Sequence, residues 1–177
     1  MNLKANHNQA GFTLVEALLT ALLFSLLLGA CLVLFLASSD SWQTNSVRVE
    51  LQQELRKAVD WMRQDLLVAG ASTITNVPAD GTWDNTISFR TATGVSNGAV
   101  VWSGSTIQFQ RGGTGSLDLQ RVSGAQTKVL AKNISTLQFR RLAASPQLLE
   151  VNVIASKTTL KGRSLSNTIS FKVALRN

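Results

Sequence analysis

The stretch Gly11-Phe12-Thr13-Leu14-Val15-Glu16 opens an apolar run that continues to residue 37 and decides how this chain folds. Within residues 12–37, Glu16 carries the only formal charge. A helix of about 26 residues spans roughly 39 Å, which exceeds the roughly 30 Å hydrocarbon core of a bilayer. The run therefore predicts a helix that can cross a membrane and remain there.

The residues before the run do not form an ordinary secretory signal. Residues 1–11 are polar and contain one lysine, Lys4, whereas a secretory signal has a shorter apolar stretch followed by a small-residue cleavage site. An uncleaved signal anchor would explain the hydropathy alone. It would not explain Glu16, because a carboxylate in a membrane helix is costly and usually marks function, although a carboxylate near the membrane edge can also snorkel to the surface.

Gly11-Phe12-Thr13-Leu14-Val15-Glu16, with its polar leader and long apolar run, resembles the type IV prepilin motif. The resemblance implies that a prepilin peptidase cuts after Gly11 and methylates the new amino group of Phe12. Glu16 is then the fifth residue of the mature chain, as in that family. The family places this glutamate in an ion pair with a neighbouring subunit's amine, which sets the axial register of the filament.

The spacing of Phe12 and Glu16 has a physical reason of its own. Cleavage after Gly11 creates a cation at Phe12 in apolar surroundings, and a carboxylate four residues later lies one helical turn away. Glu16 can therefore neutralise the amine of its own chain or that of a neighbour. Glycine at the cut leaves the backbone accessible to a protease.

The helix is expected to continue beyond the apolar run to about residue 69, with Gly70 as its stop. No proline occurs between residues 12 and 77, so nothing forces a kink. Apolar residues recur every three or four positions, which is the spacing of one helical face; they are Val47, Leu51, Leu55, Val59, Met62 and Leu66. This second half is amphipathic, and its apolar stripe needs a covering domain.

After Gly70 the hydrophobic period changes from that of a helix to two, which is typical of strands with one buried face. A pattern of an aliphatic residue and a phenylalanine recurs at residues 86–90, 106–110, 136–140 and 168–172. Further strands are expected at 99–102, 116–122, 127–131 and 148–155. The chain is thus predicted to be α+β and pilin-like: a leader (1–11), a membrane and filament-core helix (12–37), its amphipathic continuation (38–70), and an antiparallel β-sheet domain (71–177).

Residues 51–70, which end in Arg63-Gln64-Asp65-Leu66-Leu67-Val68-Ala69-Gly70, resemble the helix of W-type minor pilins and J-type minor pseudopilins. The resemblance implies a minor subunit that helps to start a type IV pilus or a type II secretion pseudopilus, at its tip. The implied partners are the prepilin peptidase, major and other minor pilins or pseudopilins, the inner-membrane assembly platform and the lipid bilayer. The implied location is a single pass through the bacterial inner membrane, with the leader cytoplasmic and the C-terminal domain periplasmic, and then the filament.

Two other functions were weighed against assembly. The net charge of +7, with Trp83 and Trp102 near basic residues, would suit a DNA-binding minor pilin of an uptake filament, but packing roles for both tryptophans are favoured. Catalysis is not expected, because the only histidine, His7, lies in the leader and the only cysteine, Cys31, lies in the apolar run. No cofactor or metal is expected either. The loop 78–85 holds Asp80 and Asp84 but lacks EF-hand spacing and is interpreted as a turn.

Overall fold

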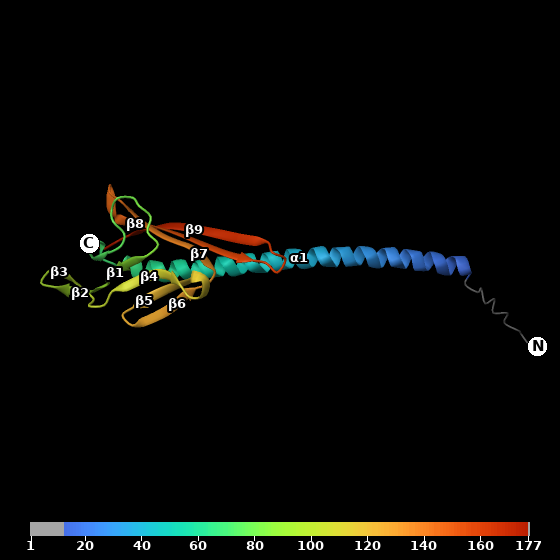
Figure 1. Cartoon of the computed structure of the whole chain (residues 1–177), viewed down its shortest axis with the longest axis horizontal. Coiled ribbons are helices and arrows are strands. Elements are labelled where there is room, and N and C mark those ends of the chain that lie inside the picture. Colours follow the sequence, from blue (N-terminus) through green and yellow to red (C-terminus); the bar gives the residue numbers. More distant parts are fainter. Residues whose placement is uncertain (1–12, 177) are drawn as a thin grey trace, which may run out of the picture. The chain divides into compact units, whose positions relative to one another are not determined.

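The computed structural model describes residues 13–176, in which one long helix precedes a domain of β-strands (Figure 1). Helix α1 spans Leu14–Leu67, 54 residues. The chain divides into two compact units, Met1–Gln43 and Thr44–Asn177, and α1 contributes to both. In the first unit the described residues are the apolar half of α1. The second unit combines the amphipathic half with the strands.

The amphipathic half of α1 buries one face against the β-domain. Leu51, Leu55, Ala58, Met62 and Leu66 are each 1% exposed or less. Their spacing of three or four residues places them on one side of the helix, so the predicted stripe is confirmed as the helical part of the core. Val47 and Val59 are only half-buried, because they lie nearer the end and the edge of this stripe.

The strands follow α1 in an order that the alternating pattern largely predicted. Their bounds are β1 (Ile87–Phe89), β2 (Ala92–Ser96), β3 (Ala99–Trp102), β4 (Ile107–Gly112), β5 (Asp118–Ser123), β6 (Gln126–Ala131), β7 (Ile134–Leu142), β8 (Ser145–Thr158) and β9 (Ser164–Ala174). Two short 3₁₀ helices also occur in residues 13–176: η1 (Ala71–Thr73) lies between α1 and β1, and η2 (Thr114–Ser116) lies between β4 and β5. Because η2 occupies residues 114–116, β5 begins at residue 118, two positions later than predicted.

All strand pairs are antiparallel, and they form three sheets. Strands β1-β4-β5-β6 make a four-stranded sheet, β7-β8-β9 a three-stranded sheet, and β2-β3 a hairpin. The two larger sheets flank the amphipathic half of α1, with β9 along one side and β5 and β6 along the other (Figure 1). The fold is therefore α+β and pilin-like: one long N-terminal helix whose second half packs against antiparallel sheets.

The recurring aliphatic and phenylalanine pairs supply the sheet side of the core. Their side chains in β1, β4 and β7 are buried, including Phe89, Phe109 and Phe139, none of which is exposed to solvent. The fourth pair, Ile169 and Phe171 of β9, is only half-buried and packs against the margin of the core. The shared pattern therefore predicts which face of all four strands turns inward, but not how deeply each strand is buried.

The hairpin β2-β3 differs from the prediction, which placed a strand at 99–102 and only a turn signal before it. Strand β2 contains Gly94 and is mostly exposed, so it has no buried alternation to signal a strand. Its register shifts at Ala92 and Gly94, as in a β-bulge. The turn is carried by Asn97 and Gly98, both with positive φ, as a tight hairpin requires.

The end of α1 is set by the hairpin as well as by Gly70. The helix stops at Leu67, two residues before the predicted end, because the backbone of Val68 and Ala69 bonds to the strands instead. Gly70 then passes directly against the ring of Trp102. A Cβ atom on Gly70 would lie 2.4 Å from Cη2 of that ring, so no larger residue fits without displacing it.

Candidate processing and assembly site

The predicted cleavage point lies at the edge of what the structure describes. Gly11 and Phe12 fall outside the described residues, and Thr13 is the first residue placed. Thr13 stands immediately before the first residue of α1 and accepts a hydrogen bond through Oγ1 from the backbone N–H of Glu16, at 3.3 Å. Its carbonyl oxygen accepts the N–H of Ala17, at 3.1 Å. Thr13 is therefore the N-cap of α1.

The pair of Thr13 and Glu16 has the spacing of a capping box, in which a Ser or Thr N-cap is followed three residues later by Glu or Gln. The sequence analysis missed this local role, although the T-x-x-E pattern was there to be found. Glu16 lies in the first turn of α1, where the helix dipole favours a negative charge, and its side chain is exposed. The helix dipole therefore favours the carboxylate at this position, and the carboxylate remains accessible to another group.

The apolar half of α1 exposes apolar side chains on all sides of the helix. All residues from 14 to 37 are exposed, including Leu14, Leu18, Phe24 and Phe35. α1 is the one described helix long and apolar enough to cross a membrane. Soluble proteins do not leave apolar surfaces of this extent in water, so this half of the helix is built for lipid or for other apolar helices.

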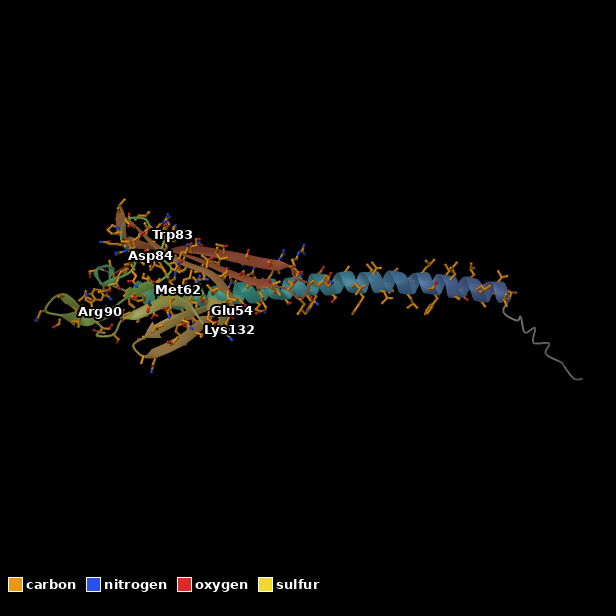
Figure 2. All side chains as sticks on the ribbon, viewed as in Figure 1. Glu54, Met62, Trp83, Asp84, Arg90 and Lys132 are labelled. Carbon is orange, nitrogen blue, oxygen red and sulfur yellow. The ribbon has the colours of Figure 1, made fainter. Side chains whose placement is uncertain are left out.

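In the second unit, acidic side chains along one flank of α1 hold the helix to the strands. Asp65 pairs with Arg121 Nε of β5 at 2.6 Å. Glu54 Oε2 accepts the backbone N–H of Lys132 at 2.7 Å, and Figure 2 shows these two residues side by side. Glu50 completes the set by pairing with Lys157 of β8 at 2.6 Å. Sequence reasoning missed these contacts because their basic partners lie far away along the chain.

Replacing Asp65 by Asn should lower the free energy of unfolding by about 1 kcal/mol, since Arg121 would keep its partly buried position without a carboxylate. The matched control is Asp60→Asn, an exposed aspartate on the same helix that is in none of the ion pairs found among the described residues, and it should change stability little. Urea unfolding of the two detergent-solubilised full-length variants, followed by tryptophan fluorescence, measures the difference. Equal effects of the two replacements would contradict the role given to Asp65.

A second charged row crosses the three-stranded sheet. Arg140, Glu150 and Lys172 are cross-strand neighbours on β7, β8 and β9. Glu150 pairs with both basic residues, and Arg140 Nε lies 2.9 Å from its carboxylate. The guanidinium of Arg140 also lies over the ring of Trp83, 4.4 Å from the ring centre. The row therefore joins all three strands and attaches the loop that carries Trp83.

This row should make the domain sensitive to acid. Hydrogen bonds from Lys172 and then Arg140 lower the pKa of Glu150 below its usual value of 4.5. A carboxyl group whose pKa is lower in the folded state stabilises the protein above its unfolded pKa, and that contribution is lost as the pH falls through the folded pKa. We therefore expect melting temperature to fall from about pH 7 to about pH 3, and to fall less in Glu150→Gln.

Circular dichroism melting of both full-length proteins in a non-ionic detergent measures this difference. At neutral pH the Glu150→Gln variant should be the less stable of the two, because it lacks the paired charge. An identical loss of melting temperature on acidification in both proteins would contradict the assignment to Glu150.

The loop 78–85 is organised as a turn by its own side chains. Asp80 Oδ1 accepts hydrogen bonds from the backbone N–H and the hydroxyl of Thr82, at 2.8 and 2.7 Å. These bonds lower the pKa of Asp80. Asp84 pairs through its backbone with Phe139 of β7, and Figure 2 places it beside Trp83. Across residues 13–176, no three His, Cys, Asp or Glu side chains gather as metal ligands would.

Comparison with known proteins bears on the N-terminal segment. Residues 6–32 match the family model described as the prokaryotic N-terminal methylation motif. No curated protein and no solved structure gives a significant match to the chain. The matched residues include the predicted cleavage point and Glu16. The motif supports a type IV prepilin-like family and indicates a pilin-like protein that a prepilin peptidase processes.

Proposed function

We propose that this type IV prepilin-like chain is a minor pilin or pseudopilin that helps to start a type IV pilus or a type II secretion pseudopilus from its tip. In this account the prepilin peptidase cuts after Gly11 and methylates Phe12. The apolar half of α1 first holds the product in the inner membrane and then packs among other subunits. The β-domain faces the periplasm and contacts neighbouring subunits, and the role of the chain is structural rather than enzymatic.

The observation that carries this proposal is the exposed apolar half of α1 with one carboxylate in its first turn. A membrane anchor requires only the apolar residues, and placing the charged Glu16 side chain in a membrane costs free energy. That cost is offset if a cation comes to the carboxylate. The motif match at residues 6–32 points to the source of such a cation, the amino group that cleavage would create at Phe12.

A minor rather than a major subunit is proposed from residues 51–70, whose last residues have specific partners in the fold. Asp65 pairs with Arg121, Leu66 and Ala69 are buried, and Gly70 lies against Trp102. The run that resembles W-type and J-type minor subunits is thus the part of α1 that joins the β-domain. The proposal of a minor subunit rests on this resemblance, and the structure shows that the same run fixes α1 to the β-domain.

The alternative of a DNA-binding minor pilin receives less support from the two tryptophans named for it. The Trp102 ring is half-buried against Gly70, and the Trp83 ring carries the guanidinium of Arg140. Stacking on nucleic-acid bases needs free ring faces. Lys157, which lies close in sequence to Lys161 and Arg163, is paired with Glu50. We therefore favour assembly over DNA binding as the role of the domain.

Immunogold labelling of filaments from the native host, with antibodies against the β-domain, tests the minor role. We expect few gold particles per filament, placed at one end, and co-purification of the solubilised chain with other subunits that have short leaders. Labelling along the whole length would mean a major subunit instead. Absence from filaments and from such complexes would sink the proposal.

A further inference from the structure

The two flanks of the amphipathic half of α1 are charged oppositely, and only one of them is used inside the domain. The acidic flank of Glu50, Glu54 and Asp65 is bound to the strands, as described above. The other flank carries Arg48, Arg56 and Arg63, which fall within a sector about 80° wide on the helix, and the exposed Asp60 lies next to this sector on its solvent side. All three are exposed, and the ion pairs found among the described residues include none of them.

The C-terminal end of this arginine flank lies beside β9, an outer strand of its sheet. The Arg63 guanidinium lies 6.0 Å from the centre of the Phe171 ring. The N–H of Arg176 bonds to Ala69 O at 2.9 Å, so the end of β9 lies near the end of α1. At the other end Lys157 of β8, the cross-strand partner of Leu165, reaches Glu50 on the acidic flank, so the start of β9 also lies near α1. Strand and helix therefore run side by side in the same direction.

The free edge of β9 offers backbone groups for pairing. β9 pairs with β8 without a register shift from Ser164 to Ala174, and no strand within residues 13–176 lies on its other side. The N–H of Thr168 points away from β8, since it donates to the side chain of Asn167 at 2.9 Å. In an antiparallel strand, alternate residues share this direction, so Ser166, Ser170 and Lys172 also present outward N–H and C=O groups.

A strand added at this edge would extend the sheet over the arginine flank. Its side chains facing α1 would meet the arginines and would cover Leu165, Ile169 and Phe171, which are only half-buried. We propose that the edge of β9 and the arginine flank together bind an extended acidic segment of a partner chain by strand addition. Charge complementarity favours this occupant, because a second copy of this chain would bring Lys172 and its own arginine flank, which are also basic.

The spacing of the arginines specifies the pattern of the bound segment. Arg48 and Arg56 are about 12 Å apart along the helix, and Arg56 and Arg63 about 10 Å. In a strand, residues four apart lie on one face and are separated by about 13 Å. Carboxylates at positions i, i+4 and i+8 of the partner strand would therefore match the arginines approximately, with apolar residues between them on the same face.

A synthetic peptide with that pattern tests the proposal on the full-length chain in non-ionic detergent. The probe is a fluorescent peptide of about 11 residues, with Glu at i, i+4 and i+8, Val between them on that face, and Thr on the other. The control peptide has the same composition with each Glu moved by one position, onto the opposite face. Anisotropy should show binding that weakens with salt and is about tenfold weaker for the control peptide.

Adjacent residues of α1 provide matched variants. Arg56→Gln removes a charge from the arginine flank and should weaken binding about threefold. Lys57→Gln removes a charge from the next position, which pairs with Glu54 instead, and should leave binding unchanged. Asn167→Ala should strengthen binding, because the N–H of Thr168 is then free for the added strand. Hydrogen exchange at Ser166, Thr168, Ser170 and Lys172 should slow when the peptide binds.

The proposal is overturned if the two peptides bind equally, or if the two helix variants lose binding equally. It is also overturned if the peptide does not bind at low salt, or if β9 pairs with a second copy of the chain. We take the natural segment to come from a neighbouring filament subunit, and this identification rests on the proposed function. The peptide test does not depend on it. If the peptide does not bind, the proposed minor-pilin role is unaffected. If the chain is absent from filaments, a positive peptide result is likewise unaffected.

Discussion

A chain with valine in place of Gly11 stays uncut in the membrane. The expected result follows from the backbone at the scissile bond, which glycine leaves accessible and a branched side chain obstructs. Intact-mass spectrometry of the membrane fraction should find the variant with its leader, residues 1–11, while the natural chain has lost it. The expected effect on processing is nearly complete loss, because the side chain lies at the bond to be cut.

Gly29 offers a control for this replacement within the same segment. It lies inside the apolar half of α1, and a Cβ atom there would meet nothing within 4 Å. Gly29→Ala should therefore be processed like the natural chain. Normal removal of the leader from Gly11→Val would show that cleavage does not occur after Gly11.

The second large effect is expected at Glu16. A Glu16→Gln chain should be processed normally, yet its amount in sheared filaments should fall about tenfold or more, because an amine at Phe12 would lose its carboxylate partner in apolar surroundings. Glutamine serves the capping box as well as glutamate does, so this replacement removes the charge and keeps the local helix start. Quantitative blotting of membrane and filament fractions measures the ratio.

The reciprocal variant separates the charge of Glu16 from its role in capping. Thr13→Ala removes the hydroxyl that accepts the Glu16 N–H and should cost about 1 kcal/mol at the start of α1. It keeps the carboxylate, so incorporation should remain close to normal. If Thr13→Ala loses incorporation and Glu16→Gln does not, then Glu16 acts as a capping residue and the ion pair with the amine is wrong.

Much of this fold could be predicted because its strongest signals are periodic. The buried row from Leu51 to Leu66 and the phenylalanines of β1, β4 and β7 repeat at helical and strand spacing, and both patterns are confirmed. The hairpin β2-β3 was half missed, because an exposed strand containing Gly94 has no buried face to alternate. An alternating hydrophobic pattern arises only where one face of a strand is buried, so it cannot predict an exposed strand such as β2.

The contacts that join distant parts of the chain could not be predicted from spacing. Asp65 and Arg121 are 56 residues apart, and nothing near either residue identifies the other. The same holds for Gly70 and Trp102, where a glycine that the sequence indicated as a helix stop is also required by a ring in another strand. The arginine flank can be recognised as a candidate binding surface only once the structure shows that the opposite, acidic flank is bound to the strands.

At the candidate site, the motif could be recognised from sequence because cleavage, charge and apolar length lie within one short segment. Glu16 was singled out as the lone charge, and the structure adds its neighbour Thr13 as the N-cap of α1. The roles of Gly11, Phe12 and Glu16 in processing and assembly remain predictions.

The measurement that tests the central claim most directly is the N-terminus of the natural chain isolated from its host membrane. Intact-mass spectrometry with N-terminal fragmentation should find a chain that begins at Phe12 and carries one added methyl group on its amine. A chain that begins at Met1, or that has been cut after the apolar run, would contradict the account.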